Sequence, residues 1–178
     1  PLVLDLTPPP LGVPAPFNQR FLLNVDQWDG FPQGKQGLFA RLPAGSVVLS
    51  GDIHATLVGT QAVTGGAIAE FTTPAVSSAS FRELLATTAA NDPLLAPLAA
   101  ALLPALDQLI APAGLSYVQT TRPGHTVLDS TPSEFKANIR QYDPLVVLSP
   151  PPASAPAPQR DLHYRFDGQN LSGTPTPG

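Results

Sequence analysis

The chain has 178 residues, the size of one ordinary domain and enough to bury a hydrophobic core. Apolar residues make up 43% and charged residues only 12%, which argues against a charged, disordered chain. The net charge of −4, with only nine scattered Lys and Arg residues, predicts no nucleic-acid-binding surface. No apolar run is long enough for a membrane span, and the lack of Cys excludes disulfides and thiolate metal sites.

Proline divides the sequence into three parts. Six of the 23 prolines fall in residues 1–16 and six in residues 144–158. We therefore predict a Pro-rich connection over 1–16, a globular part over 17–143, and a Pro-rich segment with a terminal edge strand over 144–178. Because the sequence contains no Met, we expect a processed product or a fragment, with any signal peptide upstream.

The first globular elements predict a mixed α+β fold. A short amphipathic helix is expected over Gln33–Leu42, ended by Pro43. Val47–Ser50 is a β-branched apolar run between glycines, and it is the clearest strand. Its unbroken hydrophobicity predicts an interior strand that is buried on both faces of a layered sheet. Ala67–Pro74 alternates apolar and polar residues and predicts a second strand.

Helices and further strands are expected in the second half. A helix capped by a Ser among residues 78–80 should run through Leu85, and another should run from Asn91 to about Ile110. Pro97 and Pro104 should bend or break the second helix. The predicted strands are Leu115–Thr121, Thr126–Ser130, Glu134–Tyr142, Val146–Leu148 and, as a hairpin strand at a sheet edge, Asp161–Phe166.

The strongest candidate for chemistry is Gly51-Asp52-Ile53-His54, directly after the Val47–Ser50 strand. Loops at the carboxyl ends of strands expose side chains while the sheet holds them rigidly. The Asp52 carboxylate suits a hard cation and the His54 imidazole a transition metal, so both could face one metal centre. The alternative is a turn Asp and a partly buried His with ordinary hydrogen bonds. Two ligands are also too few for a complete site.

A second candidate is the Asp26–Phe31 segment, which holds the only Trp. It could be a turn that caps the next helix, with Trp28 and Phe31 filling the core. Alternatively, Trp28 or Asp29 could lie beside a substrate.

Other features give no catalytic signature. His125 and His163 are isolated and are expected to be surface or packing residues. The sequence has no G-x-S-x-G elbow and no Gly-rich phosphate loop.

Taken in order, the motifs DQWDGF, VVLSGDIH, EFTTPAVSS and LDSTPSEFKANIRQYD resemble the C-terminal part of the PhoD-like alkaline phosphatases. These enzymes belong to the calcineurin-like metallophosphoesterases, and the resemblance covers about Asn24 to Phe166. It implies part of a four-layer α/β/β/α sandwich that hydrolyses phosphate esters with a metal-activated water. It also implies a secreted or periplasmic protein.

The same resemblance implies the site residues and the metals. Asp52 and His54 match ligands of a multinuclear centre of iron and calcium. Asp26, Trp28 and Asp29 match motif residues and form a possible substrate pocket.

The chain departs from the family pattern in three places. The earlier motifs, which carry the remaining ligands, are absent, so the resemblance implies that an N-terminal half, separate or missing, completes the site. Asn91–Ala111 looks like an insertion, and His125 stands where an aromatic residue is expected.

Two alternatives therefore stay open at this point. One is a non-catalytic β-rich module that binds a partner chain through an apolar surface such as Leu94–Ile110. The other is an inactive relative that keeps the fold. The presence or absence of a metal bound near His54 separates the module from the enzyme.

Overall fold

A computed structural model describes residues 3–7, 13, 17–22, 27–110, 115–144 and 155–177. The first sheet has the strand order β3-β5-β4-β6, the second sheet has the order β10-β9-β8-β7, and β1 pairs with β2. The strands are β1 (Val3–Asp5), β2 (Arg20–Leu22), β3 (Val47–Ser50), β4 (Thr56–Val63), β5 (Gly66–Thr72), β6 (Leu115–Gln119), β7 (Gly124–Ser130), β8 (Phe135–Gln141), β9 (Arg160–Phe166) and β10 (Leu171–Pro177). The helical elements are η2 (Trp28–Gly30), α1 (Pro32–Phe39), α2 (Phe81–Ala90), α3 (Leu95–Leu102), η3 (Leu103–Ala105) and α4 (Leu106–Leu109).

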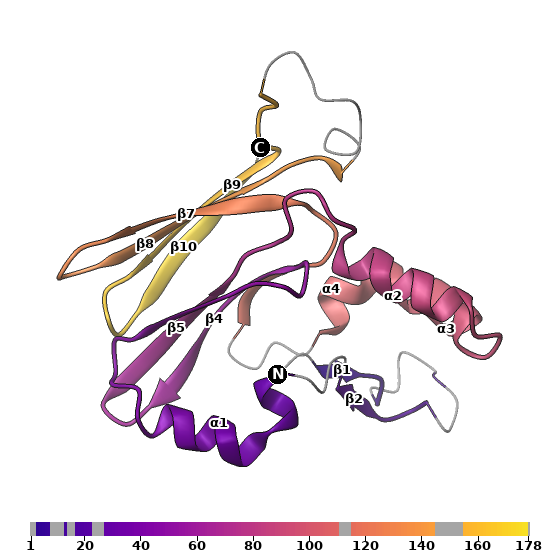
Figure 1. The fold of residues 1–178 in the computed structure, drawn as a ribbon, viewed down its shortest axis with the longest axis horizontal. Helices are drawn as coiled ribbons and strands as arrows, with labels where there is room; N and C mark the ends of the chain where they lie inside the picture. The colour runs from indigo at the N-terminus through magenta and orange to yellow at the C-terminus, as the bar shows by residue number, and fades with distance from the viewer. Residues whose placement is uncertain are drawn as a thin grey trace.

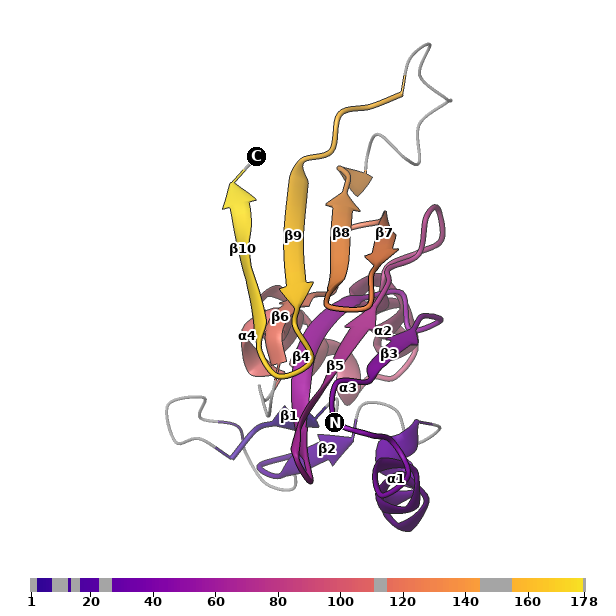
Figure 2. The same cartoon turned by 90° about the vertical axis from the view of Figure 1, so that its left-hand side faces the viewer.

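The two four-stranded sheets pack against each other through their inner faces (Figures 1 and 2). Val58 and Phe71 of the first sheet and Ile139, Leu162 and Phe166 of the second belong to one buried cluster. Side chains of a strand alternate between its two faces, so every second residue of β8 and β9 points into this core. The alternation of exposed and buried residues along β9 follows this rule.

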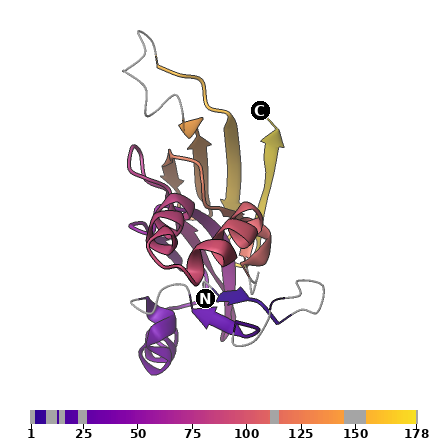
Figure 3. The same cartoon turned by 90° about the vertical axis from the view of Figure 1, so that its right-hand side faces the viewer.

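The opposite face of the first sheet is covered by helices (Figure 3). Leu57 of β4 packs in a second buried cluster with Phe81 of α2 and Leu106 of α4. The second sheet, the first sheet and the helices α2 and α4 therefore form three layers. The described residues place no helix on the outer face of the second sheet, where Lys136 and Arg165 are exposed (Figure 1). The predicted α+β class is confirmed, and the four-layer sandwich is not.

The prediction that Val47–Ser50 is an interior strand is wrong. The strand forms, but among the described strands β3 lies at the edge of the first sheet and pairs only with β5, in parallel. Val47 and Val48 are half-buried, and Leu49 is 53% exposed. The strand that is buried on both faces is β4, because it lies between β5 and β6 and between the second sheet and the helices.

The predicted helices are largely confirmed. Ser80 caps α2, as expected from the sequence. The region expected as one bent or broken helix forms α3, a 3₁₀ turn that contains Pro104, and α4. Pro97 lies in the first turn of α3, where the missing N–H removes no helical hydrogen bond. No helix of the described residues is long and apolar enough to cross a membrane.

Strands form near both ends of the chain, with differences from the sequence prediction. Asp161–Phe166 forms a hairpin strand as expected, but β9 is an inner strand, because β10 pairs with its free side and becomes the edge. Within the segment expected as a Pro-rich connection, residues 3–5 form β1. The strand expected at Val146–Leu148 lies outside the described residues.

Candidate metal site

The turn after β3 has an unusual backbone. Asp52 has a φ of 68° and His54 a φ of 59°, and these are the non-glycine residues with positive φ in the described part of the chain. Asp and His enter this left-handed region more readily than most residues. It still costs about 1–3 kcal/mol per residue, so the surrounding structure must hold the turn in place.

His54 is held at both its side chain and its backbone. Its Nδ1 lies 2.6 Å from the carbonyl oxygen of Ala79, and its own carbonyl oxygen accepts a 3.0 Å hydrogen bond from the Phe81 N–H. A carbonyl oxygen can only accept, so Nδ1 must carry the proton. The neutral ring then leaves the Nε2 lone pair free to bind a metal. Histidine ligands commonly show this arrangement, in which one ring nitrogen donates to a carbonyl and the other binds the metal.

Asp52 lies two residues before His54 and is exposed. Oxygen atoms of neighbouring strand ends lie close by. The Ser50 hydroxyl is 2.8 Å from the Thr72 hydroxyl, and the Thr73 N–H donates to the Ser50 carbonyl at 2.9 Å. Thr126 of the second sheet donates through its hydroxyl to the Thr73 hydroxyl at 3.1 Å. The carboxyl ends of β3 and β5 and the start of β7 therefore meet beside the turn.

The donor types fit a metal, but their number does not complete a site. An imidazole with a free Nε2 and an exposed carboxylate are suitable ligands for transition and hard cations respectively. Across the described ranges, no group of three or more His, Cys, Asp or Glu side chains could hold a metal ion together. At most, this part of the chain contributes two ligands of a site that needs four or more.

A model of the PhoD-like phosphatase family matches residues 10–139. The chain belongs to the PhoD-like phosphatase family. Membership indicates a hydrolase that acts on phosphate esters, and the matched range includes β3, the Gly51–His54 turn and the strands that meet beside it. No curated protein and no solved structure matches the chain.

In this PhoD-like chain, the expected substrate-pocket residues are only partly described. Trp28 and Phe31 are 56% and 58% exposed, so the alternative in which both fill the core is wrong. A methyl group added at Gly34 would lie 3.5 Å from the Trp28 ring, which therefore rests beside α1. Asp29 lies in η2, and Asp26 is outside the described residues.

The other two histidines lie away from any cluster of ligands. The ring of His125 stacks on Tyr142 with a centroid distance of 5.7 Å. His163 forms a 2.8 Å hydrogen bond between its Nδ1 and Asn138 on the second sheet. Neither belongs to a group of three or more candidate ligands in the described residues.

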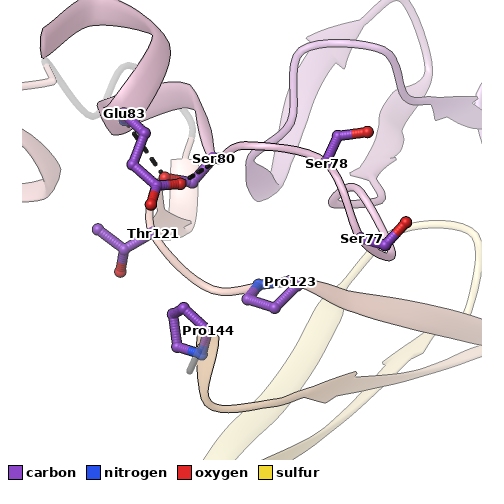
Figure 4. Close-up of a pocket in the computed structure, with 7 residues that line it drawn as sticks. All are labelled: Ser77, Ser78, Ser80, Glu83, Thr121, Pro123 and Pro144. Atoms are coloured by element: carbon purple, nitrogen blue, oxygen red, sulfur yellow. Dashed lines mark hydrogen bonds between the residues drawn. The ribbon is translucent and has the colours of Figure 1, made fainter. Parts of the chain in front are cut away.

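A small pocket lies beside Ser77, Ser78 and Ser80, in the segment whose Ala79 carbonyl contacts the His54 ring (Figure 4). Asp52 and His54, the two expected metal ligands, do not line this pocket. Its lining residues are Ser77, Ser78, Ser80, Glu83, Thr121, Pro123 and Pro144. The sequence predicted a Ser cap among residues 78–80 but not the contact of this segment with His54, because only the fold brings residues 79–81 to residue 54. The spacing of Ser80 and Glu83 was a readable signal for the helix start.

Proposed function

We propose that this chain supplies part of the active site of a metal-dependent phosphatase or phosphodiesterase, with Asp52 and His54 as metal ligands. The observation that carries the proposal is the hydrogen bond between His54 Nδ1 and the Ala79 carbonyl oxygen, which leaves Nε2 as the free ring nitrogen. The family match, whose range of residues 10–139 includes this turn, adds a second, independent support. When bound, the metal ions would lower the pKa of a water molecule and neutralise charge on the phosphate oxygens.

The chain's own residues have defined tasks in this proposal. The Ala79 carbonyl fixes the tautomer and the orientation of the His54 ring. Asp52 presents an exposed carboxylate from the same turn, held by the left-handed backbone. The family resemblance suggests iron and calcium as the metals. An imidazole and a carboxylate together suit such a mixed centre.

We further propose that the N-terminal half of the enzyme completes the site along the free edge of β3. Among the described strands, β3 pairs only with β5, and the pairing is parallel. A strand that joined β3 in the same direction would bring its carboxyl end beside Asp52 and His54. Its loop could then supply the missing ligands. The half-exposed Leu49 would be covered by the same contact.

The substrate is proposed to be a phosphate monoester or diester, and Asp26, Trp28 and Asp29 are candidates for its pocket. The exposed ring of Trp28 could contact an apolar group of such a substrate. The family resemblance also suggests that the protein works outside the cytoplasm, as a secreted or periplasmic enzyme.

Hydrolysis of a simple phosphate monoester and a simple phosphate diester by the full protein tests this function. We expect His54→Ala and Asp52→Asn to lose most of the turnover, because each removes a group that sets the charge and position of the metal. The matched control is His163→Ala, which removes a histidine on the second sheet that also has a side-chain partner. Full turnover in His54→Ala would reject the proposed ligand role. Absence of turnover in the unaltered protein on both substrates would favour an inactive relative.

A further inference from the structure

The proposed function uses His54 but not the segment that holds it. Residues 79–81 contact His54 twice, through the Ala79 carbonyl at Nδ1 and through the Phe81 N–H at the backbone carbonyl. The second contact satisfies one of the N–H groups that the first turn of a helix leaves without a helical partner. The turn and the start of α2 therefore stabilise each other, and the position of His54 depends on where α2 begins.

The start of α2 is fixed by a reciprocal pair of hydrogen bonds (Figure 4). The Ser80 N–H donates to the Glu83 carboxylate at 2.6 Å, and the Glu83 N–H donates to the Ser80 hydroxyl at 3.3 Å. Ser80 is buried, so alternative partners from water are restricted. This capping box sets the backbone directly after Ala79, whose carbonyl meets the His54 ring.

A second anchor fixes the same helix turn from the other side. The Arg82 N–H donates to the Thr120 carbonyl at 3.1 Å, and the Arg82 guanidinium lies 3.4 Å from the Asp107 carboxylate. The same Asp107 oxygen accepts a hydrogen bond from the Thr120 N–H at 3.1 Å. Thr120 is fully buried. The first turn of α2 is thus held both to the end of β6 and to α4.

We propose that Ser80 and Glu83 are positioning residues that select the Nδ1–H tautomer of His54 and hold its Nε2 in one orientation. They act through the Ala79 carbonyl and do not touch the reacting atoms. The inference rests on the proposed function only for the statement that His54 binds a metal. The tautomer itself is a property of this chain and can be measured without any metal.

Nitrogen NMR of ¹⁵N-histidine-labelled full protein tests the tautomer directly, with the His54 signals assigned by their loss in His54→Gln. Protonated and unprotonated ring nitrogens differ strongly in chemical shift. We expect the unaltered protein to show one neutral tautomer with the proton on Nδ1. Ser80→Ala and Glu83→Leu, which each remove one hydrogen-bond acceptor of the capping box, should show a mixture of the two tautomers. Their affinity for added metal should fall by about ten- to hundred-fold, the usual effect of losing a partner that orients a ligand.

The matched control is Asp92→Ala, which removes a side chain that accepts backbone hydrogen bonds at the start of the neighbouring helix α3. The Asp92 carboxylate accepts hydrogen bonds from the N–H groups of Leu94 and Leu95 at 2.8 and 3.3 Å. This variant should keep the His54 tautomer and the metal affinity. If Ser80→Ala fails to fold, Glu83→Leu carries the test, because Glu83 is exposed and its replacement leaves no cavity in the core.

Two outcomes distinguish a failure of the positioning role from a failure of the proposed function. A single Nδ1–H tautomer with undiminished metal affinity in both Ser80→Ala and Glu83→Leu would overturn the positioning role. A tautomer that changes in these variants, in a protein whose His54 signals do not respond to metal, would support the positioning role and reject the proposed function.

Discussion

The core between the two sheets and the turn after β3 differ in how completely this chain covers their side chains. Between the sheets, Ala137, Ile139 and Leu162 are completely buried, and every side is covered by residues of this chain. At the end of β3, Leu49 is half-exposed and Asp52 is exposed on a left-handed backbone. The first region is fully covered by this chain, and the second leaves an apolar and an acidic side chain exposed.

The two regions therefore contribute differently, because the core stabilises the fold and the turn carries the residues of the proposed site. Apolar contacts in the core need no further partner, so their contribution to folding is already present in the chain. The turn instead holds Asp52 and His54 on a strained backbone, and no third His, Cys, Asp or Glu of the described residues joins them in a group that could hold a metal. Strain of this kind persists where the surrounding structure enforces it, and it is concentrated at functional sites.

The largest expected effect is a difference in the free energy of unfolding between the variants Ile139→Ala and Leu49→Ala. Ile139→Ala should lower the free energy of unfolding by about 2–5 kcal/mol, because it leaves a cavity in the core. Leu49→Ala should change it by no more than about 0.5 kcal/mol in this chain, because the side chain is half-exposed. Urea unfolding measures both.

The same pair of variants also tests the proposal that another strand joins the free edge of β3. In the full protein, Leu49→Ala should become clearly more destabilising, because a neighbouring strand would then cover the side chain. Equal losses for both variants in the isolated chain would remove the contrast between the two regions.

A second effect concerns the polar bridge between the sheets. The fully buried Gln141 donates to the Thr56 hydroxyl at 2.8 Å and accepts from the Tyr117 hydroxyl at 2.8 Å. Thr56→Val keeps the shape but leaves a buried N–H of Gln141 without that partner, so we expect a loss of about 1–3 kcal/mol in urea unfolding. Thr88→Val on the exposed surface of α2 is the control and should cost no more than about 0.5 kcal/mol. A loss in the control as large as in Thr56→Val would contradict this assignment.

A third effect appears at alkaline pH. Burial between the sheets raises the pKa of Tyr164 from 10.0 to about 12. Because the unfolded chain releases this proton at lower pH, the contribution of Tyr164 to stability should be present below about pH 10 and disappear as the pH rises toward 12. Ultraviolet titration, with the signal assigned by Tyr164→Phe, measures the ionisation. Ionisation at the ordinary value would mean that water reaches this part of the core.

The smallest effect concerns the cap of α2. Hydrogen bonds from Ser80 lower the pKa of Glu83, so its folded value lies below the unfolded one. The unfolded state therefore binds the proton first, and the stabilisation should be present above about pH 4.5 and be lost as the pH falls below it. Thermal unfolding across this range should show a slightly weaker pH dependence in Glu83→Gln. An identical pH profile in Glu83→Gln would show that this carboxylate contributes no such stabilisation.

Local patterns in the sequence predicted local structure well. The capping residues of α2, the alternating β5 and the break at Pro104 depend on neighbours within a few positions. The order of strands depends on distant partners, and there the prediction failed. The run Val47–Leu49 is apolar enough for an interior strand, but hydrophobicity does not reveal which chain segment covers it.

Long-range contacts also limited which features of the site could be predicted from the sequence. The position of Asp52 and His54 after a strand was readable, because it depends on adjacent residues. The bond between His54 and Ala79 spans 25 positions and emerges only from the fold. Strand β4 was missed because Gly59 and Gln61 interrupt its apolar pattern, although pairing on both sides buries its first half.

The metal content of the full protein tests the central claim most directly. Elemental analysis of the unaltered protein, Asp52→Asn, His54→Ala and the control His163→Ala should find metal bound in the first and last. The two turn variants should lose most of it, and this 178-residue chain alone should retain little, since its described residues offer two ligands at most. Unchanged metal content in His54→Ala would contradict the account, and His54 would then be a residue that serves only the packing of the turn.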